Sequence, residues 1–261
     1  MKKRKNYLWI SILSFVIGFF LWWLFTEGLG TVSPKVMPGP IRVFQSFIQK
    51  FYDRTPDGAT LLQHLGSSIE ITLIGFFIGT VIGLPLGIIM AWYKKVDMFV
   101  RPLFDLLRPI PGIAWIPVMI VLFGIGLFSK AMVVFLAVFV AIVINTYTGI
   151  KQTKSVHLWV AKTFGASYFY TLIHVAIPTA LPMIMTGLRV ALGAAWTTII
   201  AAELLASTKG IGFMIQQSRG MFRPDIIIVG MIGIGITGAI LGVLLSGLEK
   251  LVLKGREAKH G

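Results

Sequence analysis

Long apolar blocks are the feature that most restricts how this chain can fold. An apolar stretch of about 18 or more residues is long enough to cross the roughly 30 Å hydrocarbon core of a bilayer as a helix. None of the blocks shows the strict alternation of a transmembrane β-strand. The six expected spans are Leu8–Phe25, Ile69–Trp92, Ile113–Phe128, Met132–Tyr147, Met183–Ala206 and Ile226–Leu253. We therefore expect an all-α, polytopic membrane protein of about six transmembrane helices.

Composition supports this class and excludes several others. The chain is 56% hydrophobic, and its 261 residues leave no segment outside the spans large enough for a second core, so we expect one domain over residues 1–261. It contains no cysteine, which excludes disulfides and thiolate metal sites. The histidines His64, His157, His174 and His260 lack metal-ligand spacing, and no catalytic constellation is evident. A G-x-x-x-x-G-K-[ST] phosphate loop is absent, so we expect no enzyme activity and no cofactor held by this chain.

The basic residues predict an orientation. If the N-terminus, the loops 93–111 and 148–182 and the C-terminal end share one side, that side carries 15 of the 24 lysines and arginines, against 8 on the other. The richer side is expected to be cytoplasmic. The net charge of +14 then reflects topology and lipid headgroups, since no nucleic-acid-binding motif is present. A cleaved signal peptide is the alternative for the first span, but its apolar run is too long and lacks a cleavage site.

The segment Glu27–Ser68 is the longest one predicted outside. From Ile41 its pattern becomes helical, with Phe44, Phe47, Ile48 and Phe51 on one face and Lys50 among the polar positions. Such a helix is typical of one lying at the membrane surface. Contact with an external partner protein is the alternative.

The loop 148–182 contains a glycine between two short helical patterns. We expect helices over Val156–Phe164 and Tyr168–Ala176, with Gly165 in a left-handed turn between them. Pro178 and Pro182 are expected to stop the second helix before the next span. The resulting helix–glycine–helix projection suits docking to a soluble partner, whereas an ordinary turn between interfacial helices is the alternative.

This loop resembles the cytoplasmic loop by which permease subunits of binding-protein-dependent ATP-binding cassette (ABC) importers dock onto their ATPase. In that family the loop reads roughly E-A-A, three residues, glycine, nine residues, I-x-L-P. Here Ala161, Gly165, Val175, Ile177 and Pro178 match, while Trp159 stands at the glutamate position and Val160 at the first alanine. The resemblance implies a docking site made of Trp159, Val160, Ala161, Lys162, Gly165, Ala166, Ser167, Val175, Ile177 and Pro178.

Other segments are similar to the nitrate/sulfonate/taurine branch of these permeases, among them Gly112–Gly126 and Gly187–Glu203. The resemblance implies the pathway-forming subunit of an ATP-driven importer for a small oxyanion, in a bacterial cytoplasmic membrane. Implied partners are two ATPase subunits carrying ATP and Mg²⁺, an extracytoplasmic solute-binding protein and a second permease copy. The alternatives are a permease for a vitamin precursor such as a pyrimidine and, more remotely, an ATP-independent secondary transporter.

Two sets of residues within the spans are further candidates. Gly75, Gly79, Gly83 and Gly87 recur every four residues, and Gly238 and Gly242 repeat the spacing, which predicts close helix packing or a subunit seam. Charged residues inside a membrane are functional candidates. Arg189 is expected either to reach the headgroups or to take part in translocation or gating. Glu203 is expected to order the external loop through the backbone N–H groups of Lys209–Phe213, with a gating role as the alternative.

Overall fold

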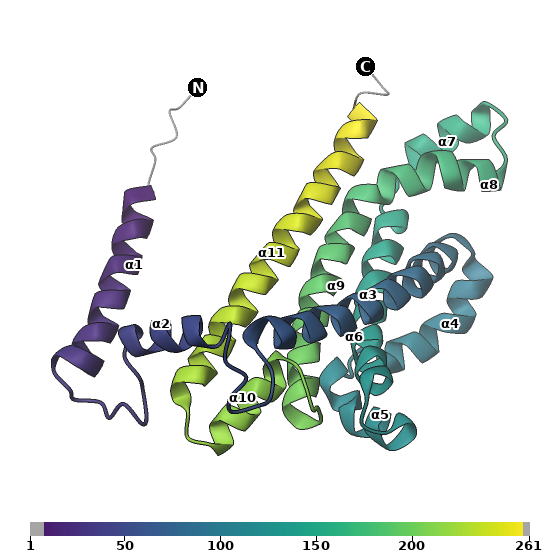
Figure 1. Cartoon of the computed structure of the whole chain (residues 1–261). Helices are drawn as coiled ribbons and strands as arrows, with labels where there is room; N and C mark the ends of the chain where they lie inside the picture. The colour runs from purple at the N-terminus through teal and green to yellow at the C-terminus, as the bar shows by residue number, and fades with distance from the viewer. Residues whose placement is uncertain (1–7, 258–261) are drawn as a thin grey trace.

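All regular structure in residues 8–257, which the computed structural model describes, is helical (Figure 1). The principal helices are α1 (Leu8–Trp23), α2 (Pro40–Gln49), α3 (Leu61–Trp92), α4 (Lys94–Leu107), α5 (Ile116–Phe123), α6 (Leu127–Lys151), α7 (Ser155–Thr163), α8 (Tyr168–Thr171), α9 (Ile177–Leu205), α10 (Ile211–Gly220) and α11 (Pro224–Glu257). The expected all-α class is confirmed.

Four helical stretches are long and apolar enough to cross a membrane. They are α3, α6, the continuous stretch Tyr168–Leu205 and most of α11. A fifth span is a broken one, because α4 and the segment Gly112–Phe123 meet at 84°. The apolar helical segment Ile12–Gly28 is shorter. Residues 8–257 thus contain four spans, or five if the bent pair is one span, with the shorter Ile12–Gly28 helix at the place of the predicted first span.

The predicted third span, Ile113–Phe128, was wrong in its limits. Lys94–Leu107, predicted as a loop, is helical, and the chain then turns sharply before α5. The break before the next span lies at Gly124, whose φ of 76° ends α5, rather than at Ser129–Ala131, which belong to α6. A left-handed backbone is open to glycine at little cost, so this glycine rather than the polar Ser-Lys pair ends the helix.

The prediction that Pro178 and Pro182 stop the helix was also wrong. A π-helical turn, Leu172–Ala176, joins α8 to α9 without a break. Pro178 is the second residue after this π turn, and Pro182 lies inside α9. The wider turn absorbs the change that the prolines require, since π segments insert an extra residue into a helix.

The centre of the molecule is the packing of α3, α6 and α9. A Cβ atom at Gly75 or Gly79 would lie 2.6 Å from the Val134 or Val138 side chain of α6. Gly83 and Gly87 face the same helix. The glycine repeat therefore lets the α3 backbone approach α6 within one chain. In α11, Gly238 lies against Trp196 of α9, whereas the Cβ position of Gly242 faces open space.

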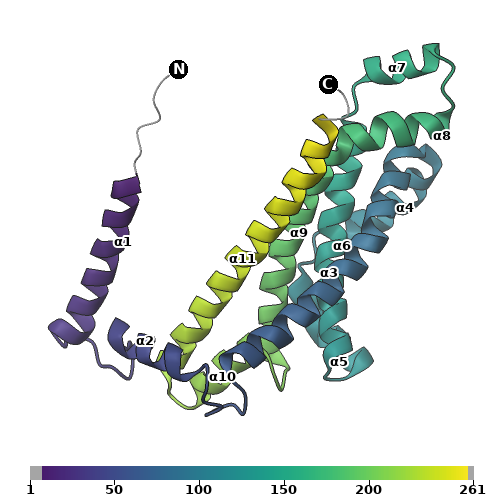
Figure 2. The ribbon, with the colours of Figure 1, turned by 45° about the horizontal axis from the view of Figure 1, so that its top comes forward.

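The two ends of the molecule differ. Figures 1 and 2 place α7 and α8 at the same end as the start of α1 and the end of α11. The helices α2, α5 and α10 lie at the opposite end, and α1 stands apart from the bundle. We call the α7–α8 end the docking end and the α2–α10 end the distal end.

The helix predicted from Ile41 is confirmed as α2, but its faces are divided differently. Val43 and Ser46 are buried against α11 and its neighbours, while Phe44 and Ile48 stay exposed. Lys50, placed on the polar face by the sequence pattern, is only 2% exposed.

Candidate docking loop and distal polar cluster

Gly165 closes α7 with a defined hydrogen-bonded turn. Its φ is +76°, and its N–H donates to the Lys162 carbonyl at 3.0 Å. The Ala166 N–H donates to the Ala161 carbonyl, also at 3.0 Å. This pair of bonds is the Schellman motif, which needs a left-handed residue at the Gly165 position. Ala161, Lys162 and Ala166 thus contribute their backbone groups to the turn.

Ser167 starts the next helix. Its side-chain oxygen accepts a hydrogen bond from the Tyr170 N–H, as an N-cap does. Tyr168 then donates its hydroxyl to the Trp92 carbonyl at the end of α3, at 2.7 Å, and its ring lies against the Trp92 ring. The loop is therefore rigid in itself and anchored to the end of a membrane span.

Large apolar side chains of this loop are exposed beside polar ones such as Lys162. The Trp159 side chain is 66% exposed and Phe164 is 87% exposed, with Val160 and Phe169 also exposed. Contiguous exposed apolar surface on a protein marks an interaction site. Trp159 lies on this surface with Lys162, whereas Val175, Ile177 and Pro178 lie in the helical stretch that supports it.

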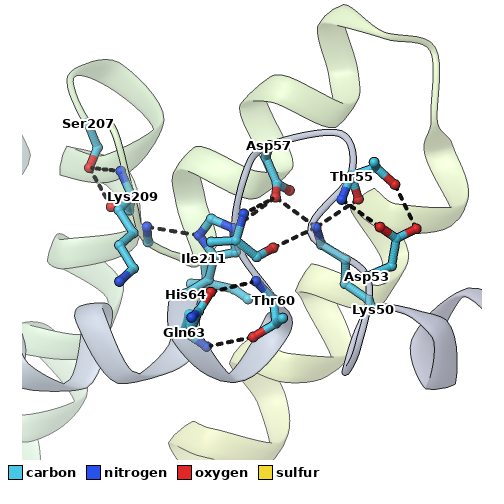
Figure 3. Close-up of polar contacts among 12 residues, drawn as sticks. Lys50, Asp53, Thr55, Asp57, Thr60, Gln63, His64, Ser207, Lys209 and Ile211 are labelled. Carbon is cyan, nitrogen blue, oxygen red and sulfur yellow. Dashed lines mark hydrogen bonds and ion pairs between the residues drawn. The ribbon is translucent and has the colours of Figure 1, made fainter.

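At the distal end, a buried lysine organises the segment between α2 and α3 (Figure 3). The Lys50 ammonium donates to the Thr55 carbonyl at 2.9 Å, the Ala59 carbonyl at 2.9 Å and Asp57 Oδ1 at 2.7 Å. All three of its protons have acceptors. A buried charge is stable when it is paired and fully hydrogen-bonded, as here.

His64 connects this segment to the loop before α10. Its Nε2 lies 3.0 Å from Asp57 Oδ1, and its Nδ1 accepts a hydrogen bond from the Gly210 N–H at 3.1 Å. Because Nδ1 is an acceptor, Nε2 carries the proton and donates to Asp57. Burial alone would raise the pKa of Asp57, but hydrogen bonds from His64 and Lys50 outweigh it and lower that pKa below its ordinary value of 3.8.

Glu203 continues the cluster from the end of α9. It accepts hydrogen bonds from Ser68 Oγ at 2.8 Å and from the Gly212 N–H at 3.0 Å, and the Ile211 N–H donates to Ser68 Oγ. The expectation that Glu203 orders the loop before α10 is confirmed. Gly210, with a φ of +129°, leaves room for the carboxylate, since a Cβ there would overlap it.

Sequence reasoning missed Lys50, His64 and Ser68. One signal was available: His64, Ser68 and Thr72 recur every four residues along one face of α3, and all three are fully buried. Polar residues repeating along one face of a transmembrane helix indicate a polar contact inside the bundle.

Arg189, a candidate for translocation, is engaged elsewhere in the chain. Its guanidinium forms an ion pair with Glu249 of α11. The charge is therefore partnered, and the pair joins α9 to α11. Within the described residues, no group of three or more His, Asp or Glu side chains is arranged to hold a metal ion.

Fold and loop together define a class: a helical membrane protein with an exposed, partly apolar helix–glycine–helix loop at one end. The family model for the inner membrane component of binding-protein-dependent transport systems matches residues 83–257. The chain belongs to this family of ABC transporter permeases.

Curated relatives agree with the family. The chain is 34% identical over 246 residues to the taurine transport system permease protein TauC of Escherichia coli (strain K12), covering 92% of this chain and 87% of TauC. It is 30% identical to the putative aliphatic sulfonates transport permease protein SsuC of Bacillus subtilis (strain 168), covering 99% and 92%. It is 31% identical to the bicarbonate transport system permease protein CmpB of Synechococcus elongatus, covering 93% and 88%.

A solved structure supports the fold. A chain of the inward-facing MetNI methionine ABC transporter aligns with a TM-score of 0.60 and 18% identity, over 75% of this chain and 95% of that one. This likeness concerns the fold alone.

Proposed function

We propose that this permease imports a small oxyanion, with ATP hydrolysed by separate ATPase subunits that bind the α7–Gly165–α8 loop. The observation that carries the proposal is the rigid loop with its exposed apolar surface. A loop that transmits the movement of an ATPase must keep its shape. Three contacts hold the shape of this loop: the Gly165 turn, the Ser167 cap and the Tyr168–Trp92 hydrogen bond. ATP and Mg²⁺ would then be held by the ATPase and not by this chain.

Two copies of the permease fit this arrangement best. An ABC importer carries two ATPase subunits, and each needs a docking loop. This chain has one such loop, so we propose a homodimer around a shared pathway. An extracytoplasmic solute-binding protein would deliver the solute at the distal end.

The substrate class rests on the named relatives. Taurine, aliphatic sulfonates and bicarbonate are all small molecules with an anionic oxygen-bearing group, which favours an oxyanion over a heterocyclic vitamin precursor. The Arg189–Glu249 pair leaves little uncompensated charge at that point of the chain. Selection would therefore occur mainly in the binding protein, and a role for Arg189 in the pathway would require the pair to open.

Gly165→Val is expected to weaken both ATPase co-purification and taurine uptake by about fivefold or more, since a left-handed backbone costs an L-residue about 1–2 kcal/mol. No atom lies within 4 Å of the Cβ position at Gly165, so strain in the turn, and not a clash, would be the cause. Gly165→Asn is the matched control, because asparagine tolerates this conformation.

Full association and uptake in Gly165→Val would contradict docking through this turn. A wild-type transporter that docks its ATPase but takes up neither taurine, a short alkanesulfonate nor bicarbonate would remove the substrate class and leave docking intact.

Cysteine labelling is expected to place the docking end in the cytoplasm. The chain has no natural cysteine, so Lys162→Cys and Thr208→Cys each introduce a single exposed thiol. In intact cells a membrane-impermeant maleimide should label position 208 and not 162, and both after permeabilisation. Labelling of 162 alone in intact cells would reverse the orientation.

A further inference from the structure

The turn between α10 and α11 repeats the Gly165 turn with a phenylalanine in place of the glycine. The Phe222 N–H donates to the Arg219 carbonyl at 3.2 Å, and the Arg223 N–H donates to the Ser218 carbonyl at 2.9 Å. This is again the Schellman pattern. Phe222 has a φ of +54° and is the one non-glycine residue with positive φ in the described part of the chain.

A phenylalanine in this position is unfavourable for the fold. A bulky residue at positive φ is a genuine outlier, because its Cβ approaches the following carbonyl. The Phe222 side chain is also 85% exposed, so packing within the described chain does not compensate. The turn at Gly165 shows that glycine satisfies the same hydrogen bonds. The phenyl ring is therefore better explained by something outside the chain.

The surroundings of Phe222 indicate what that partner resembles. Beside it lies an open hollow of about 410 Å³, lined among others by Lys35, Arg219, Arg223 and Ile227. Arg223 is paired with Asp225, but Lys35 and Arg219 have no ion-pair partner among residues 8–257. An aromatic side chain that shares a hollow with two uncompensated cations complements an acidic surface with an apolar recess.

The turn is also held rigidly. Arg223 donates to both oxygens of Asp225, and Ser46 of α2 donates to Asp225 Oδ2 at 2.7 Å. Asp225 is buried at the start of α11, so its bonds to Arg223 and to Ser46 of α2 hold the turn against these two helices. An aromatic side chain carried on a firmly held turn requires less backbone ordering on binding, which is typical of an interface anchor.

The place of the α10–α11 turn in the fold indicates which partner it can meet. The α10–α11 turn lies at the distal end, opposite α7 and α8 (Figures 1 and 2). We propose that Phe222, with Lys35 and Arg219, is an anchor for the extracytoplasmic solute-binding protein, which presents an acidic rim around an apolar recess. This inference rests on the proposed function, because it requires that protein to approach the distal end. Insertion of the ring into lipid would not need a strained turn, so we favour a protein partner.

The decisive variant is Phe222→Gly, since it separates stability from docking. Removing the strain is expected to raise the thermal midpoint of the permease by about 2–4 °C. In the complete transporter in lipid nanodiscs, the concentration of solute-binding protein that gives half-maximal ATPase stimulation should rise about tenfold. Lys35→Gln and Arg219→Gln should each raise it less, with a weaker dependence on salt. Tyr52→Ala is the matched control, because Tyr52 is equally exposed, at 85%, but lies outside the hollow.

Each outcome has a definite meaning. If the binding protein of the same transport system does not stimulate the wild-type complex, the proposed function fails. If it stimulates wild type and Phe222→Gly equally, only the Phe222 anchor is overturned. A spin label at Phe222→Cys that is shielded from a water-soluble relaxation agent in nanodiscs without binding protein would assign the ring to lipid and also overturn the proposal.

Discussion

Lys50→Met is expected to destabilise the protein by about 3–5 kcal/mol, the range for breaking a buried ion pair by removing one partner. The variant would leave the buried Asp57 carboxylate without its ammonium, and the Thr55 and Ala59 carbonyls without their donor. The hydrogen bond from the Lys50 ammonium to the Ala59 carbonyl is buried, so water cannot replace the lost donor there. Thermal unfolding of the purified permease in detergent should show a midpoint lowered by about 10 °C.

Lys209→Met is the control for this variant, because Lys209 is an exposed lysine in the same distal region. Its unfolding midpoint should match wild type. Equal midpoints for the Lys50 and Lys209 variants would mean that the buried ammonium does not hold the segment between α2 and α3.

The pH dependence of the same site has a defined sign. The folded pKa of Asp57 lies below its ordinary value of 3.8, so its ionised form stabilises the fold. This contribution is complete above about pH 4 and is lost as the pH falls through the folded pKa. The difference in unfolding free energy between wild type and Lys50→Met should therefore be larger near neutral pH than in strong acid.

Gly75→Ala is expected to destabilise the α3–α6 packing by about 1–3 kcal/mol through overpacking. The added Cβ would lie 2.6 Å from the Val134 side chain and 2.9 Å from the Ala131 carbonyl oxygen. The carbonyl belongs to the α6 backbone and cannot rotate away, so the two helices must separate. This loss should exceed the gain of about 1 kcal/mol that alanine brings to a helix interior.

Gly66→Ala offers a matched control within α3, because no atom lies within 4 Å of its Cβ position. It should raise stability by about 1 kcal/mol, because alanine favours a helix interior more than glycine does. Thermal unfolding of the two variants should thus shift in opposite directions, and a shift of the same sign and size would show that the glycine repeat does not set the distance between α3 and α6.

Local chemistry explains which predictions were right. Apolar length fixes the helical membrane class, because a backbone in lipid must satisfy its own hydrogen bonds. The left-handed turn at Gly165 and the helix before it were predictable, since a Schellman turn depends on neighbouring residues alone. Where local signals compete, the predictions were wrong. Pro178 and Pro182 do not stop the helix, because a π-helical turn precedes them. The break between α5 and α6 lies at Gly124 instead of Ser129–Ala131.

By itself, the sequence determined the all-α membrane fold, the family and the left-handed turn at Gly165, all of which depend on residues close together in the chain. Only the tertiary structure decided that Lys50 is buried, that His64 and Ser68 join Glu203 in one cluster, and that Arg189 pairs with Glu249. The contacts of His64, Glu203 and Arg189 include groups on other helices, with the Ser68–Glu203 bond alone joining residues 135 positions apart. Packing between distant helices sets such distances, and no local pattern of residues encodes them.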